Sequence, residues 1–184
     1  MKKEDPRITR TRKVIHDTFL ALLEEKNYDE ITVQDILDKA DINRSTFYKH
    51  YLNKDALATH IIERLKADVI IPILEQRFSS PTMEFALKAA PIINEYRKTI
   101  RLLWQIETRR INLKQDMQKI IRQKYLENQA ASSPLSDEDK RFQGQFFAII
   151  SIGMLEYVLM NDKPLDPQKT HVNLQEVLRY FVLK

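Results

Sequence analysis

The sequence predicts an all-α protein, and three observations support this. The 184 residues include only two glycines, a composition that favours helices. Apolar residues recur at helical spacing in one segment after another, which together predict about nine helices. Polar stretches that contain serine or proline separate these segments at 79–82, 128–136 and 163–168.

The composition limits the class of protein. With 43% hydrophobic residues the chain is not wholly disordered, and its net charge of +4 is modest. The absence of cysteine excludes disulfides, thiolate metal sites and thiol nucleophiles, and it fits a cytoplasmic setting. The N-terminus is polar, and the longest apolar run, 146–155, is too short to span a bilayer. We therefore expect a soluble protein with no membrane partner.

The first helix is predicted at 9–26, after an arm that is rich in lysine and arginine. Its apolar face carries Ile15, Phe19, Leu22 and Leu23. A second helix is predicted at 33–40, where Thr32 caps the N-terminus and Asp35, three residues later, completes a capping-box pattern.

A sharp turn is predicted next, followed by a third helix at 44–51. Asp41 tolerates a left-handed backbone and Asn43 can cap the helix. Phe47 and Tyr51 lie four residues apart, so they are expected to face inward. The rest of the helix is rich in hydrogen-bond donors, and no acidic residue occurs between 44 and 54. Such a surface suits a polyanion, and the segment resembles a helix-turn-helix whose second helix enters the major groove of DNA.

The residue order makes the resemblance specific. Residues 31–33, 35–36, Ala40, 45–48, Tyr51 and Lys54 resemble the DNA-binding head of the TetR family of transcriptional regulators, over about residues 8–60. Asn27 and Asp41 stand where the family often has glycine, and both can adopt left-handed geometry. Leu52 replaces a frequent proline or glycine.

The resemblance implies a role for each polar residue of this segment. Phosphate contacts are expected from Thr32, Tyr48, Lys49 and Lys54. Base contacts are expected from Arg44, Ser45, Thr46 and His50.

Further helices are predicted after the head. One begins at 53 or 54 and runs through Val69 until Pro72 bends or ends it. Others are predicted at 82–95 and 96–107, with Pro91 as a kink or boundary, and at 112–127, 137–160 and 171–183. We divide the chain into an N-terminal arm with a helix-turn-helix domain, 1–54, and a helical domain for ligand binding and dimerisation, 55–184.

The last two predicted helices carry more apolar surface than one small body can bury. A four-helix contact with a second copy would cover the excess, so we predict a homodimer, as the resemblance also implies.

No catalytic constellation is visible, and we predict neither an enzyme nor a cofactor nor a metal site. The four histidines are scattered, and a phosphate-binding glycine loop is absent. By analogy with the family, a small-molecule pocket could be lined by Trp104, Glu107, Met117, Phe147, Met154 and Tyr157. Plain core packing is the alternative for the apolar members of this set, and contact with solvent or arginine is the alternative for Glu107.

The resemblance therefore predicts a dimeric regulator, most simply a repressor that leaves a pseudo-palindromic operator in double-stranded DNA when a ligand binds the C-terminal domain. The alternative is a coactivator or adaptor of the same fold whose C-terminal domain binds a protein partner.

Overall fold

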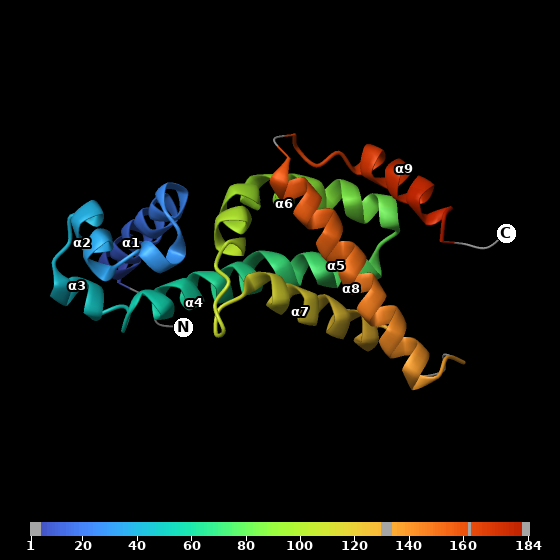
Figure 1. Ribbon diagram of the computed structural model, residues 1–184, viewed down its shortest axis with the longest axis horizontal. Helices are drawn as coiled ribbons and strands as arrows, with labels where there is room; N and C mark the ends of the chain where they lie inside the picture. The colour runs from blue at the N-terminus through green and yellow to red at the C-terminus, as the bar shows by residue number, and fades with distance from the viewer. Residues whose placement is uncertain (1–4, 130–133, 162, 182–184) are drawn as a thin grey trace. The chain divides into compact units, whose positions relative to one another are not determined.

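A computed structural model describes residues 5–129, 134–161 and 163–181 of the chain. The described part is helical (Figure 1), apart from one isolated antiparallel bridge between Glu107 and Asn112. Its α-helices are α1 (Pro6–Glu25), α2 (Val33–Ala40), α3 (Arg44–Tyr48), α4 (Lys54–Leu65), α5 (Ile71–Ser79), α6 (Thr82–Trp104), α7 (Leu113–Glu127), α8 (Asp137–Met160) and α9 (Pro167–Leu178). The predicted all-α class is confirmed.

The helices group into two compact units. The first unit holds residues up to Lys66 together with Thr99–Leu113, and the second holds Ala67–Lys98 and the residues from Lys114 onward. α4 thus groups with the helices before it, whereas the division predicted from the sequence falls at residue 54.

The first unit encloses a core built from α1 to α4. Phe19 of α1, Ile36 of α2, Phe47 of α3 and Leu57 of α4 are all fully buried. The ring of Tyr28 packs edge-on against Phe19 at 6.3 Å between centroids. These side chains are the apolar stripes expected from helical spacing, and their burial holds three short helices together.

Two prolines mark the places where the helix predictions need correction. The helix that begins at Lys54 does not reach Val69: α4 ends at Leu65, a π-helical turn follows at Lys66–Ile70, and Pro72 lies in the first turn of α5. A proline at this position loses no helical hydrogen bond.

Pro91, unlike Pro72, does not mark the end of a helix. It lies inside a single helix, α6, where a boundary or kink was expected. Its ring is exposed, while Ala89, Ala90, Ile100 and Leu103 of the same helix are buried. We attribute the continuity to this burial, which supports the helix on both sides of the missing donor.

The second unit contains a close approach between α7 and α8. A Cβ placed on Gly144 of α8 would lie 3.3 Å from the Tyr125 ring and 3.4 Å from the side chains of Arg122 and Leu126. Gly144 therefore permits the close packing of α7 against α8, whereas Gly153 faces open space.

α8 also presents apolar side chains to the outside. We call these residues the α8 stripe: they lie three, four or eight positions apart and comprise Phe142, Phe146, Ile149, Tyr157 and Met160. By length and hydropathy alone α8 could cross a membrane, although core helices of soluble proteins satisfy the same criteria. Its first turn is strongly acidic. On α9 the exposed Val172 and Val177 continue the apolar character.

α9 begins four residues earlier than expected, because Asp166 caps it and Pro167 occupies its first position. The last two residues of the predicted helix, Val182 and Leu183, lie outside the described residues.

Candidate nucleic-acid interface

Four polar residues define the ends of α2 and the turn into α3. Thr32 and Asp35 form the expected capping box, in which the Asp35 carboxylate accepts from the Thr32 N–H at 2.7 Å and the Thr32 hydroxyl accepts from the Asp35 N–H at 3.1 Å. Asp41 ends α2 with φ of 52°, a left-handed conformation that aspartate tolerates better than most residues. Asn43 then caps α3. Local sequence chemistry therefore sets the angle between the two helices.

α3 is oriented by its two aromatic anchors. Phe47 is fully buried and Tyr51, just after the helix, is 5% exposed. With these rings inward, Arg44, Ser45, Tyr48 and Lys49 are exposed, and Thr46 and His50 are half-buried. We call the exposed and half-buried residues together the α3 face. It carries cationic and hydroxyl groups and no carboxylate.

The Asn43 side chain also organises the hydroxyl groups of the α3 face. Its Oδ1 atom accepts hydrogen bonds from the Ser45 hydroxyl, the Thr46 hydroxyl and the Thr46 N–H, each at 2.8 Å. Both hydroxyl hydrogens are thereby used within the protein. The hydroxyl oxygens still have lone pairs for a donor such as a base amino group.

Gln34 is a residue of this surface that the sequence reasoning missed. Its Oε1 atom accepts a hydrogen bond from Nη2 of Arg44 at 3.1 Å, and its amide donates to Asp38 at 2.8 Å. Gln34 thus holds the Arg44 guanidinium from α2. Nothing local to residue 44 signals this partner, because the two residues meet only when α2 and α3 fold against each other.

Lys54 occupies a position different from the one expected of a phosphate contact. Its ammonium donates to the backbone carbonyls of Tyr28, Asp29 and Ile31 at 2.7, 3.2 and 2.8 Å. It also lies 4.5 Å from the centre of the Tyr28 ring, within the range of a cation–π interaction. All three ammonium hydrogens are therefore directed at the 28–31 turn.

Asp55 contributes a second link to that turn by accepting a hydrogen bond from the Tyr28 hydroxyl. Burial, followed by this hydrogen bond, raises the pKa of Tyr28. The start of α4 is thus tied to the segment that precedes α2.

A cluster of rings lies behind α3. Nε2 of His16 is 2.6 Å from the Tyr51 hydroxyl, and the His60 ring lies 5.4 Å from the His16 ring and 5.5 Å from the Tyr51 ring. Burial, followed by the charges of His60 and Arg64, lowers the pKa of His16 to about 4. A neutral His16 can accept the Tyr51 hydroxyl proton, which favours the inward position of Tyr51.

The residues predicted to line a ligand pocket fall in both units. Trp104 and Glu107 belong to the first unit, and the other four belong to the second. Met117 is buried and Phe147 and Met154 are half-buried, but Tyr157 is 71% exposed on the α8 stripe. Glu156, next to Tyr157 on α8, pairs with Lys114 at 2.7 Å.

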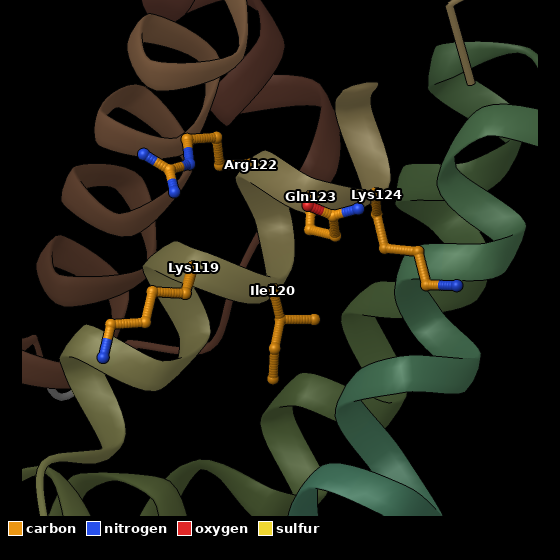
Figure 2. Close-up of a pocket in the computed structure, with 5 residues that line it drawn as sticks. All are labelled: Lys119, Ile120, Arg122, Gln123 and Lys124. Atoms are coloured by element: carbon orange, nitrogen blue, oxygen red, sulfur yellow. The ribbon is translucent and has the colours of Figure 1, made fainter. Parts of the chain in front are cut away.

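Figure 2 shows a hollow along α7. Lys119 and Arg122 project to one side of the helix, while Ile120 and Lys124 project to the other. The hollow is open and its walls are mainly basic. It contains none of the six residues predicted to line a pocket.

Residues 15–61, which include the turn and the α3 face, match the family model of the bacterial regulatory proteins of the tetR family. This segment of the chain is therefore a DNA-binding head of the tetR family type. This confirms the resemblance that the sequence suggested over residues 8–60.

Two curated proteins are similar to this chain. The uncharacterized HTH-type transcriptional regulator YxbF of Bacillus subtilis (strain 168) is 29% identical over 198 residues, covering 100% of this chain and 47% of the relative. The HTH-type dhaKLM operon transcriptional activator DhaS of Lactococcus lactis subsp. lactis (strain IL1403) is 37% identical over 60 residues, covering 33% of this chain and 32% of the relative. The chain thus spans about half the length of YxbF.

Among solved structures, a TetR transcriptional regulator from Streptococcus agalactiae 2603V superposes with a TM-score of 0.66 at 23% identity. The match covers 96% of each chain. This similarity confirms the fold of a helix-turn-helix head with a helical body.

Proposed function

We propose that this protein binds a pseudo-palindromic operator as a homodimer and represses transcription until a small molecule binds its second unit. The observation that carries the proposal is the α3 face, where the aromatic anchors turn inward and an acid-free set of donors turns outward. The match to the tetR family model supports the same conclusion.

The α3 face supports separate roles for its residues. Arg44, which Gln34 holds in place, can pair bidentately with guanine in the major groove. Ser45, Thr46 and His50 are further base contacts in this proposal. Lys49, Tyr48 and Thr32 contact phosphates. We omit Lys54 from the phosphate contacts, because its hydrogens are directed at backbone carbonyls.

The α8 stripe supports a dimer. Apolar side chains at spacings of three, four and eight residues line one face of the helix, and α9 carries exposed valines of the same character. A second copy that packs against this surface would remove it from water. A cyclic dimer also places two recognition helices on the two half-sites of a pseudo-palindrome.

Release by an effector follows from the geometry of half-sites. Half-sites on one side of DNA lie about 34 Å apart, so a change of a few ångströms in the separation of the two heads prevents simultaneous docking. The chain passes from the first unit to the second within the π-helical turn at Lys66–Ile70, and such turns often occur at functional sites. We assign the coupling to this joint.

Two substitutions test the roles on the α3 face. Arg44→Ala is expected to weaken operator binding by roughly 1 to 3 kcal/mol and to relax the preference at the base pair that it reads. Lys49→Ala is expected to weaken binding to all sequences alike and to reduce the salt dependence by about one unit of slope. Both are measured by fluorescence anisotropy with selected and scrambled duplexes over a range of salt concentrations.

Arg141→Ala, an exposed substitution on α8, is the control for loss of positive charge. Identical affinity, preference and salt dependence in the parent and in both α3 variants would contradict the assignment.

The sign of regulation is tested with a reporter gene behind the selected operator. Repression is the expected result. One relative is by name an activator, and increased transcription would replace the repressor assignment by an activator without changing the DNA contacts. If the protein is an adaptor, it should bind no duplex, and a specific protein partner should be recovered with it from extract.

A further inference from the structure

We propose that Arg77 on α5 is the anion-recognising group of an effector site in the second unit, and that the site accepts an organic carboxylate with an apolar body. This inference rests on the proposed function only in that it calls the ligand an effector. The site itself is argued from the surroundings of Arg77 alone.

Arg77 lies among aromatic rings. The central carbon of its guanidinium, Cζ, is 5.5 Å from the centre of the Phe85 ring, 5.7 Å from Phe147 and 6.0 Å from Phe78. The three rings come from α6, α8 and α5, so the cluster exists only when these helices pack together. Each distance is within the range of a cation–π interaction.

Further ring contacts complete the wall around Arg77. Tyr125 of α7 lies 5.2 Å from the Phe147 ring and 6.3 Å from the Phe78 ring, and its hydroxyl donates to Gln143 at 2.8 Å. Phe147 and Phe78 are themselves 5.7 Å apart. We call Arg77 and these four aromatic residues the Arg77 cage.

The cage is incompletely covered, in contrast to the core of the first unit. All four aromatic residues of the cage are half-buried, whereas Phe19 and Phe47 in the first unit are fully buried. The cage therefore combines apolar walls with partial exposure to solvent, a combination that suits an amphipathic small molecule.

The charge of Arg77 has no counter-ion within the described part of the chain. In the described residues, no carboxylate pairs with the Arg77 guanidinium and no carbonyl accepts a hydrogen bond from it. Most other cations of the second unit lie on open surfaces. Partial burial lowers the pKa of Arg77. A planar guanidinium with free donors matches a carboxylate through two parallel hydrogen bonds.

A purely structural role is the alternative. Cation–π contacts can stabilise a fold, and this would explain the rings without a ligand. The two interpretations differ in what they predict for Arg77→Met. If Arg77 only stabilises the fold, the substitution should lower the thermal midpoint. If Arg77 is a partly desolvated charge without a counter-ion, its removal should leave the thermal midpoint unchanged or raise it.

Calorimetric titration of the full chain tests the inference. The probes are 3-phenylpropionate and octanoate, with 3-phenylpropanol and octanol as their neutral counterparts. We expect the carboxylates to bind and the alcohols to bind at least tenfold more weakly. Arg77→Gln should weaken carboxylate binding by roughly tenfold to a hundredfold, the range of charge-assisted hydrogen bonds.

Two further variants complete the experiment. Arg77→Lys keeps the charge but loses the planar fork, so it should bind the carboxylates several-fold more weakly than the parent. It also provides a folded comparison should Arg77→Gln fail to fold. Arg141→Gln on α8 is the matched control for an exposed arginine and should bind like the parent.

Several outcomes would overturn the inference. They are carboxylate binding by the parent weaker than about 10 mM, equal binding of acids and alcohols, unchanged affinity in Arg77→Gln, or a lowered thermal midpoint in Arg77→Met. Operator binding is measured separately on the same samples. Arg77-dependent carboxylate binding without DNA binding would refute the proposed function alone, and DNA binding without carboxylate binding would refute this inference alone.

Discussion

Lys54 shows how one residue can have a different role from the one that its sequence position suggests. It follows the recognition helix, where a lysine is well placed to reach a phosphate. In the structure its ammonium donates to three carbonyls of the 28–31 turn and lies over the Tyr28 ring. We interpret Lys54 as a residue that supports the head, and therefore as an indirect contributor to DNA binding.

Lys54→Met tests this interpretation. The substitution removes the ammonium that donates to three carbonyls, of which that of Tyr28 keeps the Ile31 N–H as a donor. We expect it to lower the free energy of unfolding by about 1 to 3 kcal/mol. The salt dependence of DNA binding by the folded fraction should stay that of the parent. Denaturant unfolding and binding over a salt series measure the two effects. Unchanged stability with a reduced salt slope would restore Lys54 to the phosphate contacts.

His16 predicts a dependence of stability on pH. Its pKa of about 4 in the folded protein lies below the ordinary value of 6.5, so the unfolded chain binds more protons between these values. The contribution of His16 is complete above pH 6.5 and is lost as the pH falls toward 4. The charged or titratable groups around it are Arg12 and Asp17 on α1 and His60 and Arg64 on α4.

Urea unfolding between pH 7.5 and 4.5 measures the effect. His16→Gln keeps an acceptor for the Tyr51 hydroxyl and does not titrate, so its stability should fall less steeply with decreasing pH than that of the parent. Parallel pH profiles for the two proteins would contradict the assignment.

At the scale of the element, Asn43 and Asn53 form a matched pair of caps. Asn43 accepts from the Thr46 N–H and Asn53 accepts from the Ala56 N–H, both at 2.8 Å. Replacing either by alanine is expected to cost about 1 kcal/mol of stability. Only Asn43→Ala should also weaken operator binding beyond the loss of folded protein, because Asn43 alone orients the hydroxyls of Ser45 and Thr46.

Thermal unfolding and anisotropy titration of both variants provide the comparison. Equal effects on DNA binding would show that Asn43 acts through stability alone.

The prolines show how packing modifies a helix. Pro72 lies in the first turn of α5, just after the π-helical turn. An irregularity at this place is what its missing N–H donor suggests. Pro91 lies within α6. The sequence identified both as irregular positions but did not distinguish them, because the outcome depends on the burial of neighbouring turns.

At the scale of the whole molecule, the α8 stripe determines the predicted oligomer. Phe146→Glu places a charge in the middle of the stripe and should abolish the dimer, since an unpaired carboxylate is costly to bury. Sedimentation should give twice 21.9 kDa for the parent and 21.9 kDa for the variant. Operator binding should weaken in parallel.

Leu87→Glu is the control, because Leu87 is an exposed apolar residue of α6. This variant should remain dimeric. A monomeric parent, or a dimeric Phe146→Glu, would contradict the role of the stripe.

The sequence alone determined the local features of this protein. The capping box at Thr32, the left-handed Asp41, the Asn43 cap and the inward pair Phe47 and Tyr51 all depend on residues within one or two turns of each other. For that reason they could be predicted in place, and with them the family.

The tertiary structure alone decided which distant residues meet. Gln34 with Arg44, Lys54 with the 28–31 turn, and Arg77 with rings from two other helices are contacts between separate elements. Helical periodicity specifies which face of each helix is buried but not which helix covers it. The partners of a charged side chain, and hence its role, follow only from that packing.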